Sequence, residues 1–360
     1  MKNKGLKAGV VPALAVLAAA ALAHGARAGY SGFEASGDSA FTVRLAGVQA
    51  AALRWRRPAA RPLPLFGWKK HPPKLQSAPI TLLERTGPGA DTSGALIVLP
   101  CDFGGHETRC VMDSGNATTF IKNDAFSRRF DNEYGGQLTG ASGRRVQTAV
   151  IYPGVLSAGS IDFGSPEIFR VPVRPGAGSP FVDGTEAYLG IDVLYSKRSL
   201  ELDFGSSPRL VADQPPSFSS TENRLQRTPS GHLLVSVAVA GETVPALWDT
   251  GTSLTAVDIK YIRSRPGVFV PVGAVRTVDG ASVVQKTEIY RVKDLVIGGY
   301  RFDGDVIGMD LSHLSSILQR RGVSVILGGN FITKLNWYLD LRGKTWSVSR
   351  PQPLSQAATP

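Results

Sequence analysis

The chain has 360 residues, 42% of them hydrophobic and 19% charged, with 40 Lys and Arg against 29 Asp and Glu. This composition is typical of a globular protein of one or two domains, and it excludes a wholly disordered chain. Two cysteines exclude a disulfide-rich scaffold and a cysteine-rich zinc site.

The formal net charge of +11 is concentrated near the N-terminus. Residues 1–28 carry a net charge of +4 and residues 29–76 a net charge of +6, which leaves +1 for the rest of the chain. A nearly neutral body lacks the single-sign surface that binds phosphate backbones. We therefore expect no nucleic-acid partner.

Residues 1–28 have the pattern of a secretory signal peptide. Lys2, Lys4 and Lys7 precede an apolar run over residues 8–23, and residues 26–28 (Ala-Arg-Ala) form a small-residue cleavage site. The alternative is an uncleaved anchor, which needs about 20 apolar residues, more than this run supplies. We expect an exported bacterial protein, periplasmic or secreted, without stable membrane insertion after cleavage.

Residues 29–78 form a basic segment that is rich in proline between 56 and 74. Three interpretations remain open: a flexible linker, a pro-segment, and a patch attracted to a membrane surface or cell wall. As a pro-segment, the basic peptide would cover an acidic cleft at neutral pH and leave when carboxylates become protonated.

From residue 79 onward, short β-rich runs alternate with turns of Gly, Asp and Asn, which predicts a mostly β protein. The expected strands include residues 95–99, 146–152, 200–204, 233–239 and 337–341. Residues 213–227 contain two prolines and a run of Ser and Thr, so we expect a linker there. We also expect an amphipathic helix at 311–321 and a disordered tail at 351–360.

The region from 79 to 350 contains an internal repeat. Asp113-Ser114-Gly115 recurs as Asp249-Thr250-Gly251, 136 residues later. Three further landmarks follow in the same order at offsets of 137 to 140: Gly-Ala-Ser at 140 and 280, hydrophobic-Leu-Gly ending at 190 and 328, and Leu-Asp at 202 and 339. The repeat predicts two copies of one β lobe, 79–212 and 228–350.

In each copy the aspartate follows an apolar strand and begins a turn that contains glycine. A carboxylate at the foot of a hydrophobic core is a costly structural residue. Pseudo-symmetry would bring Asp113 and Asp249 together, and adjacent carboxylates share one proton. The ionised group would take a proton from water and the protonated one would polarise a carbonyl, which predicts amide hydrolysis without a covalent intermediate.

These two motifs, each followed by a hydrophobic-Leu-Gly, resemble those of the pepsin and retropepsin family of aspartic proteases. The resemblance covers about residues 79–350, and the spacing is closer to the retroviral type of lobe. It implies an all-β fold of two pseudo-symmetric aspartic-protease-like β-barrel lobes with a few short helices. It also implies an aspartic endopeptidase with Asp113 and Asp249 as the catalytic dyad, a polypeptide substrate, no cofactor, no metal and a monomeric state. The alternative is a non-catalytic binding or inhibitor protein with the same fold.

The resemblance assigns supporting roles around the dyad. Ser114 and Thr250 would cross-link the lobes beneath it. Gly115 and Gly251 would let backbone N–H groups approach the carboxylates. Thr252 matches a hydroxyl that the pepsin type places three residues after the second Asp.

The chain departs from the pepsin pattern at two places. Asn116 stands where pepsins carry Ser, and no tyrosine stands at the first flap tip, since Tyr134 comes too early. Residues 41–45 and 54–57 loosely resemble the strand and basic run of pepsin-type pro-segments. The resemblance places the flap and its counterpart at Gly140, Ala141, Ser142, Gly143 and Gly280.

Other reactive residues give no competing site. A two-residue turn at 105–106 would place Cys101 and Cys110 opposite each other, so we expect a hairpin disulfide in an oxidising compartment, the alternative being two free buried thiols. Asp203 and Asp340 also repeat, and we expect them to be structural acids in turns. No metal-ligand spacing links the histidines, which are His24, His71, His106, His232 and His313.

Overall fold

The computed structural model describes residues 42–45, 75–86, 93–139, 144–172, 181–182, 184–279, 283–318, 320 and 322–352. All of them belong to one compact unit, Ser39–Pro360. The expected signal peptide, most of the basic segment and most of the C-terminal tail lie outside the described residues.

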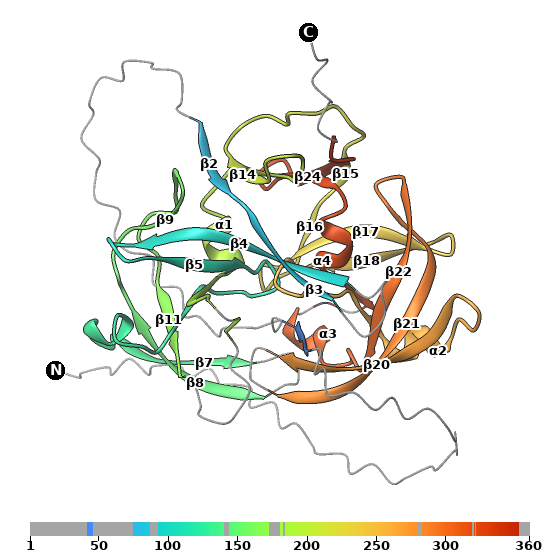
Figure 1. Ribbon diagram of the computed structural model, residues 1–360, viewed down its shortest axis with the longest axis horizontal. Helices are drawn as coiled ribbons and strands as arrows, with labels where there is room; N and C mark the ends of the chain where they lie inside the picture. Colours follow the sequence, from blue (N-terminus) through green and yellow to red (C-terminus); the bar gives the residue numbers. More distant parts are fainter. Residues whose placement is uncertain are drawn as a thin grey trace, which may run out of the picture. The chain divides into compact units, whose positions relative to one another are not determined.

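The described chain is mostly β, as the sequence predicted, and its helices are short (Figure 1). The strands up to residue 212 are β1 (Thr42–Leu45), β2 (Gln76–Pro79), β3 (Thr81–Thr86), β4 (Ser93–Phe103), β5 (Glu107–Met112), β6 (Phe120–Lys122), β7 (Tyr134–Thr139), β8 (Arg145–Ile151), β9 (Leu156–Ala158), β10 (Ile161–Asp162), β11 (Ile168–Val171), β12 (Ala187–Leu189), β13 (Ser199–Asp203) and β14 (Arg209–Ala212). The helices of this half are the 3-10 helix η1 (Ser127–Arg129) and α1 (Ile191–Leu194).

The second half has the same character. Its strands are β15 (Asn223–Arg224), β16 (Gln226–Arg227), β17 (Leu233–Val239), β18 (Glu242–Trp248), β19 (Ala256–Asp258), β20 (Phe269–Asp279), β21 (Val284–Ile297), β22 (Tyr300–Met309), β23 (Val325–Leu327), β24 (Asn336–Asp340) and β25 (Thr345–Ser349). Its helices are α2 (Ile259–Arg263), α3 (Leu314–Ile317) and α4 (Gly329–Ile332).

Six strands of the second half close into a barrel. The pairings run β17–β18–β23–β19–β22–β21, and β21 returns to β17. Alternate residues of β17, such as Val235 and Val237, pack in the same core as Trp248. Leu234 and Leu247 belong to a second hydrophobic core on the other face, together with Leu314 of α3. Both faces of these strands are therefore buried.

The same order of pairings occurs in the first half. β5 pairs with β4 and, in parallel, with β12; β12 pairs with β6, β6 with β11, and β11 with β8. β9 then returns to β4. Where the second half uses the single strand β21, the first half uses β8 and β9, separated by residues 152–155. Pro153 in this gap cannot donate to a strand ladder, which favours the interruption.

A third sheet joins the two halves, in the order β15-β25-β24-β13-β14-β2. β13 and β24, which carry the repeated Leu-Asp, are its adjacent central strands, with Leu202 opposite Trp337. Trp337 in turn packs against Trp248, at 5.8 Å between ring centroids. Removing a buried ring of this size typically costs about 3–5 kcal/mol.

The structural acids in turns were predicted correctly. Asp203 accepts a hydrogen bond from the N–H of Gly205 at 3.0 Å. Asp340 accepts from the N–H groups of Arg342 and Gly343, at 3.0 and 2.6 Å. Both carboxylates therefore replace backbone acceptors in the tight turns that follow their strands.

Three boundaries expected from the sequence are wrong. The basic segment was extended to residue 78, but β2 begins at Gln76 and pairs with β14. The expected linker 213–227 contains β15 and β16, because pairing with β25 and β17 outweighs its Ser- and Pro-rich composition. The helix expected at 311–321 is reduced to α3.

No helix in the described part of the chain has the length and apolar character needed to cross a bilayer.

Candidate active site

Two equivalent turns carry the repeated aspartates. Asp113 directly follows β5, and Asp249 directly follows β18. The N–H of Asp113 donates to the carbonyl oxygen of Leu189 at 2.9 Å, and the N–H of Asp249 to that of Leu327 at 3.0 Å. The end of each parallel partner strand, β12 or β23, therefore fixes where the aspartate leaves the sheet.

The glycine of each hydrophobic-Leu-Gly motif permits a close backbone approach. A β-carbon at Gly190 would meet the carbonyl carbon of Thr118, and one at Gly328 would meet that of Leu254. Both contacted residues belong to the segment that follows the aspartate turn. The two motifs are thus separated in sequence but adjacent in space.

Beneath the aspartates, two hydroxyls bridge the halves of the molecule. The Oγ of Ser114 donates to the carbonyl oxygen of Trp248 at 2.7 Å, and the Oγ1 of Thr250 donates to that of Met112 at 2.7 Å. Each hydroxyl oxygen also accepts from the backbone N–H of the other residue, at 3.1 Å in both directions. All of these groups are buried. The predicted cross-link is therefore present and reciprocal.

The carboxyl groups of Asp113 and Asp249 come together above this cross-link. Both side chains are 0% exposed, and the two carboxyls are close enough to interact electrostatically. The Oδ1 of Asp249 accepts from the N–H of Gly251 at 2.9 Å. A β-carbon at Gly115 would overlap the carboxyl of Asp249, so only glycine allows the first turn to approach this closely.

Burial raises the pKa of Asp113 well above its usual value, and the neighbouring carboxyl of Asp249 raises it further. The N–H groups of Gly115 and Asn116 act in the opposite direction. Burial also raises the pKa of Asp249, against backbone N–H groups that lower it. Since two adjacent buried charges are costly, the pair retains a proton to higher pH than ordinary carboxyls do.

The dyad has unused hydrogen-bonding capacity. Both carboxyl oxygens of Asp113 and the Oδ2 of Asp249 lack a protein partner of conventional geometry. Among the described residues, no Lys, Arg or His forms an ion pair with either aspartate. Buried polar atoms without partners are rare in folded proteins and indicate a site for water or a ligand.

The residues three positions after each aspartate differ. The hydroxyl of Thr252 donates to the carbonyl oxygen of Leu254 at 3.2 Å. The Oδ1 of Asn116 accepts weakly from the N–H of Thr118 at 3.4 Å, while its Nδ2 is buried without a partner. Asn116 therefore brings a buried donor without a partner into the turn that follows Asp113.

Two hairpins were expected to carry the flap and its counterpart. The structure has the two expected hairpins, β7–β8 and β20–β21. The residues expected at their tips lie outside the described residues: Gly140, Ala141, Ser142, Gly143 and Gly280.

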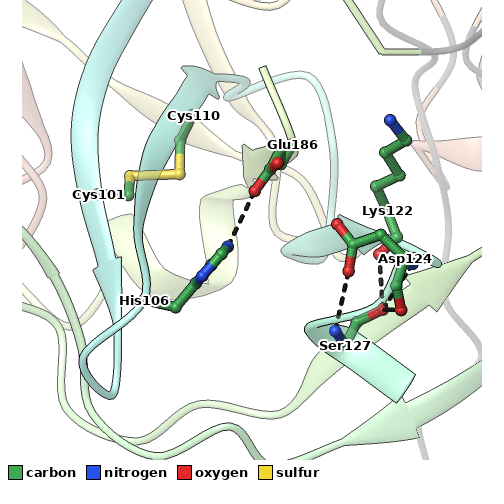
Figure 2. Close-up of polar contacts among 7 residues, drawn as sticks. All are labelled: Cys101, His106, Cys110, Lys122, Asp124, Ser127 and Glu186. Atoms are coloured by element: carbon green, nitrogen blue, oxygen red, sulfur yellow. Dashed lines mark hydrogen bonds and ion pairs between the residues drawn. A yellow bond between two sulfur atoms is a disulfide. The ribbon is translucent and has the colours of Figure 1, made fainter. Parts of the chain in front are cut away.

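Cys101 and Cys110 form the expected disulfide between β4 and β5, with Cα atoms 6.0 Å apart (Figure 2). The expected register is wrong, because Cys101 lies opposite Thr108 and not opposite Cys110. The two-residue turn is Gly104-Gly105, one position earlier than expected, and both glycines have positive φ, at 64° and 94°. Such turns match the twist of a hairpin, and they favour glycine at both positions.

A polar cluster beside this hairpin was not expected from the sequence (Figure 2). The Nε2 of His106 lies 3.0 Å from the Oε2 of Glu186, which links the turn to the segment before β12. Nearby, the N–H of Ser127 donates to Asp124 Oδ1 at 2.9 Å, and its hydroxyl donates to the carbonyl oxygen of Lys122 at 2.7 Å. These contacts fix the loop around η1 and are structural.

Sequence reasoning also missed His232. Its side chain is 0% exposed and contacts the carbonyl oxygen of Gly115 in the first aspartate turn. Its position before β17 carried no motif, because the contact joins residues 117 positions apart. Only the tertiary structure reveals it.

Comparison of the chain with models of known protein families found no match, and comparison with characterised proteins found none. The described residues contain no group of three or more His, Cys, Asp or Glu side chains placed to hold a metal ion. Any functional conclusion must therefore come from the geometry of the two aspartate turns.

Proposed function

We propose that the protein is an aspartic endopeptidase of two pseudo-symmetric, aspartic-protease-like lobes, with Asp113 and Asp249 as its catalytic dyad. One observation carries the proposal: two carboxyl groups on equivalent turns meet at 0% exposure, without an ion-pair partner among the described residues. A purely structural pair of this kind would destabilise the fold.

The chemistry follows from one shared proton. A water molecule between the carboxyls loses a proton to the ionised group, and its oxygen attacks the peptide carbonyl carbon. The protonated group hydrogen-bonds to the carbonyl oxygen and transfers its proton as the tetrahedral intermediate forms. The carboxyl that took the proton from water then gives it to the amide nitrogen, the C–N bond breaks and the amine leaves. A hydroxyl proton of the intermediate returns to the other carboxyl, so that the dyad again holds one proton. Water and a peptide bond thus become a carboxylic acid and an amine.

Recurring pairings support the two-lobe interpretation. The strand order around β5 and β12 matches that around β18 and β23. The hydroxyls of Ser114 and Thr250 each donate a hydrogen bond to a backbone carbonyl of the opposite half. The β7–β8 and β20–β21 hairpins are then the flap and its counterpart. The proposed substrate is a polypeptide. The disulfide between β4 and β5 supports export to an oxidising compartment.

The direct test is cleavage of an unfolded protein substrate from acidic to neutral pH, with and without a statine-type inhibitor. We expect cleavage that the inhibitor blocks and that Asp113→Asn and Asp249→Asn each abolish. Asp340→Asn is the matched control, because it changes a turn acid outside the dyad. If the wild-type protein cleaves no better than Asp113→Asn at any pH, the enzyme proposal fails and a non-catalytic binding protein takes its place.

A further inference from the structure

His232 is a buried titratable residue that the proposed mechanism does not use. It directly precedes β17 in the second half, yet its imidazole reaches the first aspartate turn. Nε2 lies 3.1 Å from the carbonyl oxygen of Gly115, and Nδ1 lies 2.9 Å from the hydroxyl of Ser230. The backbone N–H of His232 donates to the hydroxyl of Thr228 at 3.0 Å.

The chemistry of the partners fixes the direction of each bond. A carbonyl oxygen only accepts, so the Nε2 of His232 carries the hydrogen and Nδ1 is an acceptor. Ser230 must then donate its single hydroxyl hydrogen to Nδ1. Its oxygen accepts from the hydroxyl of Thr228, which lies 3.0 Å away. The chain Thr228, Ser230, His232, Gly115 is thus fully ordered and selects one tautomer.

This chain of hydrogen bonds ends on the peptide group that closes the turn after Asp113. The carbonyl of Gly115 belongs to the same peptide group as the N–H of Asn116, which donates to the backbone carbonyl oxygen of Asp113 at 3.2 Å and closes the first turn. The N–H groups of Gly115 and Asn116 also lower the pKa of Asp113. A hydrogen bond to a peptide carbonyl polarises the peptide and strengthens its N–H as a donor. It also fixes the orientation of the peptide plane, and with it the direction of the N–H.

The second turn has a different support. The strand registers of β4 and β17 place Leu96 at the position in the first half that corresponds to His232 in the second. Leu96 is equally buried, at 1% exposed, but its side chain cannot donate. At this position the first aspartate turn therefore receives a side-chain hydrogen-bond donor, and the equivalent position of the repeat supplies none to the second.

We propose that His232 is a positioning residue of the first aspartate turn, which acts through the Gly115–Asn116 peptide to fix the turn that holds Asp113 against Asp249. The catalytic meaning of this role rests on the proposed function, but the effect of His232 on the first aspartate turn can be tested without it.

Other titratable groups near this segment do not mimic the effect. Burial lowers the pKa of His232 to about 4, so the imidazole stays neutral above that pH. Burial raises the pKa of Tyr195 to about 12; its hydroxyl donates to the carbonyl oxygen of Gly231. The guanidinium of Arg227 lies 3.7 Å above the centroid of the Tyr195 ring, and Asp249 is the titratable group that faces Asp113.

The test is a titration of carbon-13-labelled aspartate carboxyls by NMR in the intact protein. We expect His232→Leu, which removes the donor, to raise the apparent pKa of the dyad, and His232→Gln, which keeps an N–H donor, to restore it. His313→Leu is the matched control outside the site and leaves the titration unchanged. In cleavage assays His232→Leu lowers kcat about tenfold at constant KM, the effect of one lost hydrogen bond.

An unchanged dyad titration in folded His232→Leu overturns the inference. If that variant does not fold, Ser230→Ala replaces it and produces a smaller upward shift of the same pKa; no shift in Ser230→Ala overturns the inference as well. Nitrogen-15 spectra of the wild-type imidazole must show the Nε2–H tautomer, and an Nδ1–H tautomer contradicts the geometry. If the wild-type protein cleaves nothing, the proposed function fails while the titration still decides the role of His232.

Discussion

At the scale of single residues, the two aspartates impose an electrostatic penalty on the fold. Burial raises the pKa of both Asp113 and Asp249, so the ionised forms are less stable in the folded protein than in the unfolded chain. The stability that this linkage supplies is fully present below the unfolded pKa and is lost as pH rises through the folded pKa. A fold that retains such groups does so at the expense of its own stability.

Asp113→Asn should therefore stabilise the protein at alkaline pH, because the amide has a similar shape and no charge to bury. We expect a higher Tm than wild type at about pH 8 and little difference at about pH 3, where both carboxyls are protonated in either state. Thermal unfolding at the two pH values measures this. An Asn variant that is less stable than wild type at the higher pH contradicts the linkage.

The hydroxyl of Ser114 is the second residue-scale feature, because it makes two bonds across the halves. Ser114→Ala removes the bond to the carbonyl oxygen of Trp248 and leaves the N–H of Thr250 without its acceptor. We expect a loss of about 1–3 kcal/mol in the free energy of unfolding, together with slower cleavage. Denaturant unfolding measures the loss, and the exposed Ser165→Ala serves as control. Equal stability of both variants would show that the cross-link is dispensable.

At the scale of elements, the β4–β5 hairpin shows how a single turn residue decides a register. The two cysteines were correctly expected to bond, yet the turn at Gly104-Gly105 places them on diagonal positions of the ladder. Gly-Gly-His offers two overlapping two-residue turns in the sequence. The structure selects the one that puts glycine at both positions of positive φ.

Removing this disulfide should weaken the hairpin that leads into Asp113. Replacing both Cys101 and Cys110 by Ser is expected to lower the free energy of unfolding by about 2–3 kcal/mol, mainly because the unfolded chain gains freedom. Chemical denaturation of the oxidised protein and the double variant measures the difference. A reducing agent should lower the stability of wild type and leave the double variant unchanged; equal sensitivity of both would contradict the assignment.

The basic segment is bracketed by two strands with different partners. β1 pairs in parallel with β20, at the edge of the β20–β21 hairpin, whereas β2 pairs with β14 in the sheet that joins the halves. If the segment is a pro-segment, only β1 can be released, because loss of β2 would open the shared sheet.

N-terminal sequencing of the active protein tests this arrangement. We expect processing to fall after Leu45 and before Gln76, so that β1 is removed and β2 is retained. The unprocessed protein should be less active at neutral pH than the processed one. A fully active protein that begins near Gly29 rules out the pro-segment interpretation.

At the scale of the whole molecule, a buried histidine reduces the stability of the fold at low pH, and carboxyls with raised pKa values reduce it at high pH. Burial lowers the pKa of His232 to about 4. Its contribution to the free energy of unfolding is therefore fully present above the unfolded pKa of 6.5 and is lost as pH falls toward 4. Burial raises the pKa of Asp192 to about 6, so its contribution is lost as pH rises through 6. With the dyad, these groups favour a stability maximum at mildly acidic to neutral pH.

The pKa values of Asp113 and Asp249 predict the pH profile of the proposed cleavage. In the proposed mechanism the dyad works with one shared proton, and both carboxyl pKa values are raised above the ordinary value of 3.8. The acidic limb of kcat/KM should therefore lie above pH 3.8, and activity should persist toward neutral pH. Initial rates on a stable peptide substrate measure the profile. A maximum at or below about pH 3 contradicts it.

The sequence by itself determined the β character, the two aspartate turns and their supporting Ser and Thr residues. These are local patterns: alternating apolar runs, Gly-containing turns and a repeat of constant spacing survive in one dimension. The 136-residue separation of Asp113 and Asp249 predicted their meeting because equivalent positions of two copies converge at their junction.

Only the tertiary structure decided the features that depend on long-range contacts. β15 and β16 form within a polar segment because neighbouring strands supply their hydrogen bonds. The β2 strand joins the shared sheet for the same reason. The imidazole of His232, just before β17, contacts the carbonyl oxygen of Gly115, and no local pattern encodes a contact between residues 117 positions apart. Local composition sets what a segment can form, and the packing of distant segments decides which of those forms is stable.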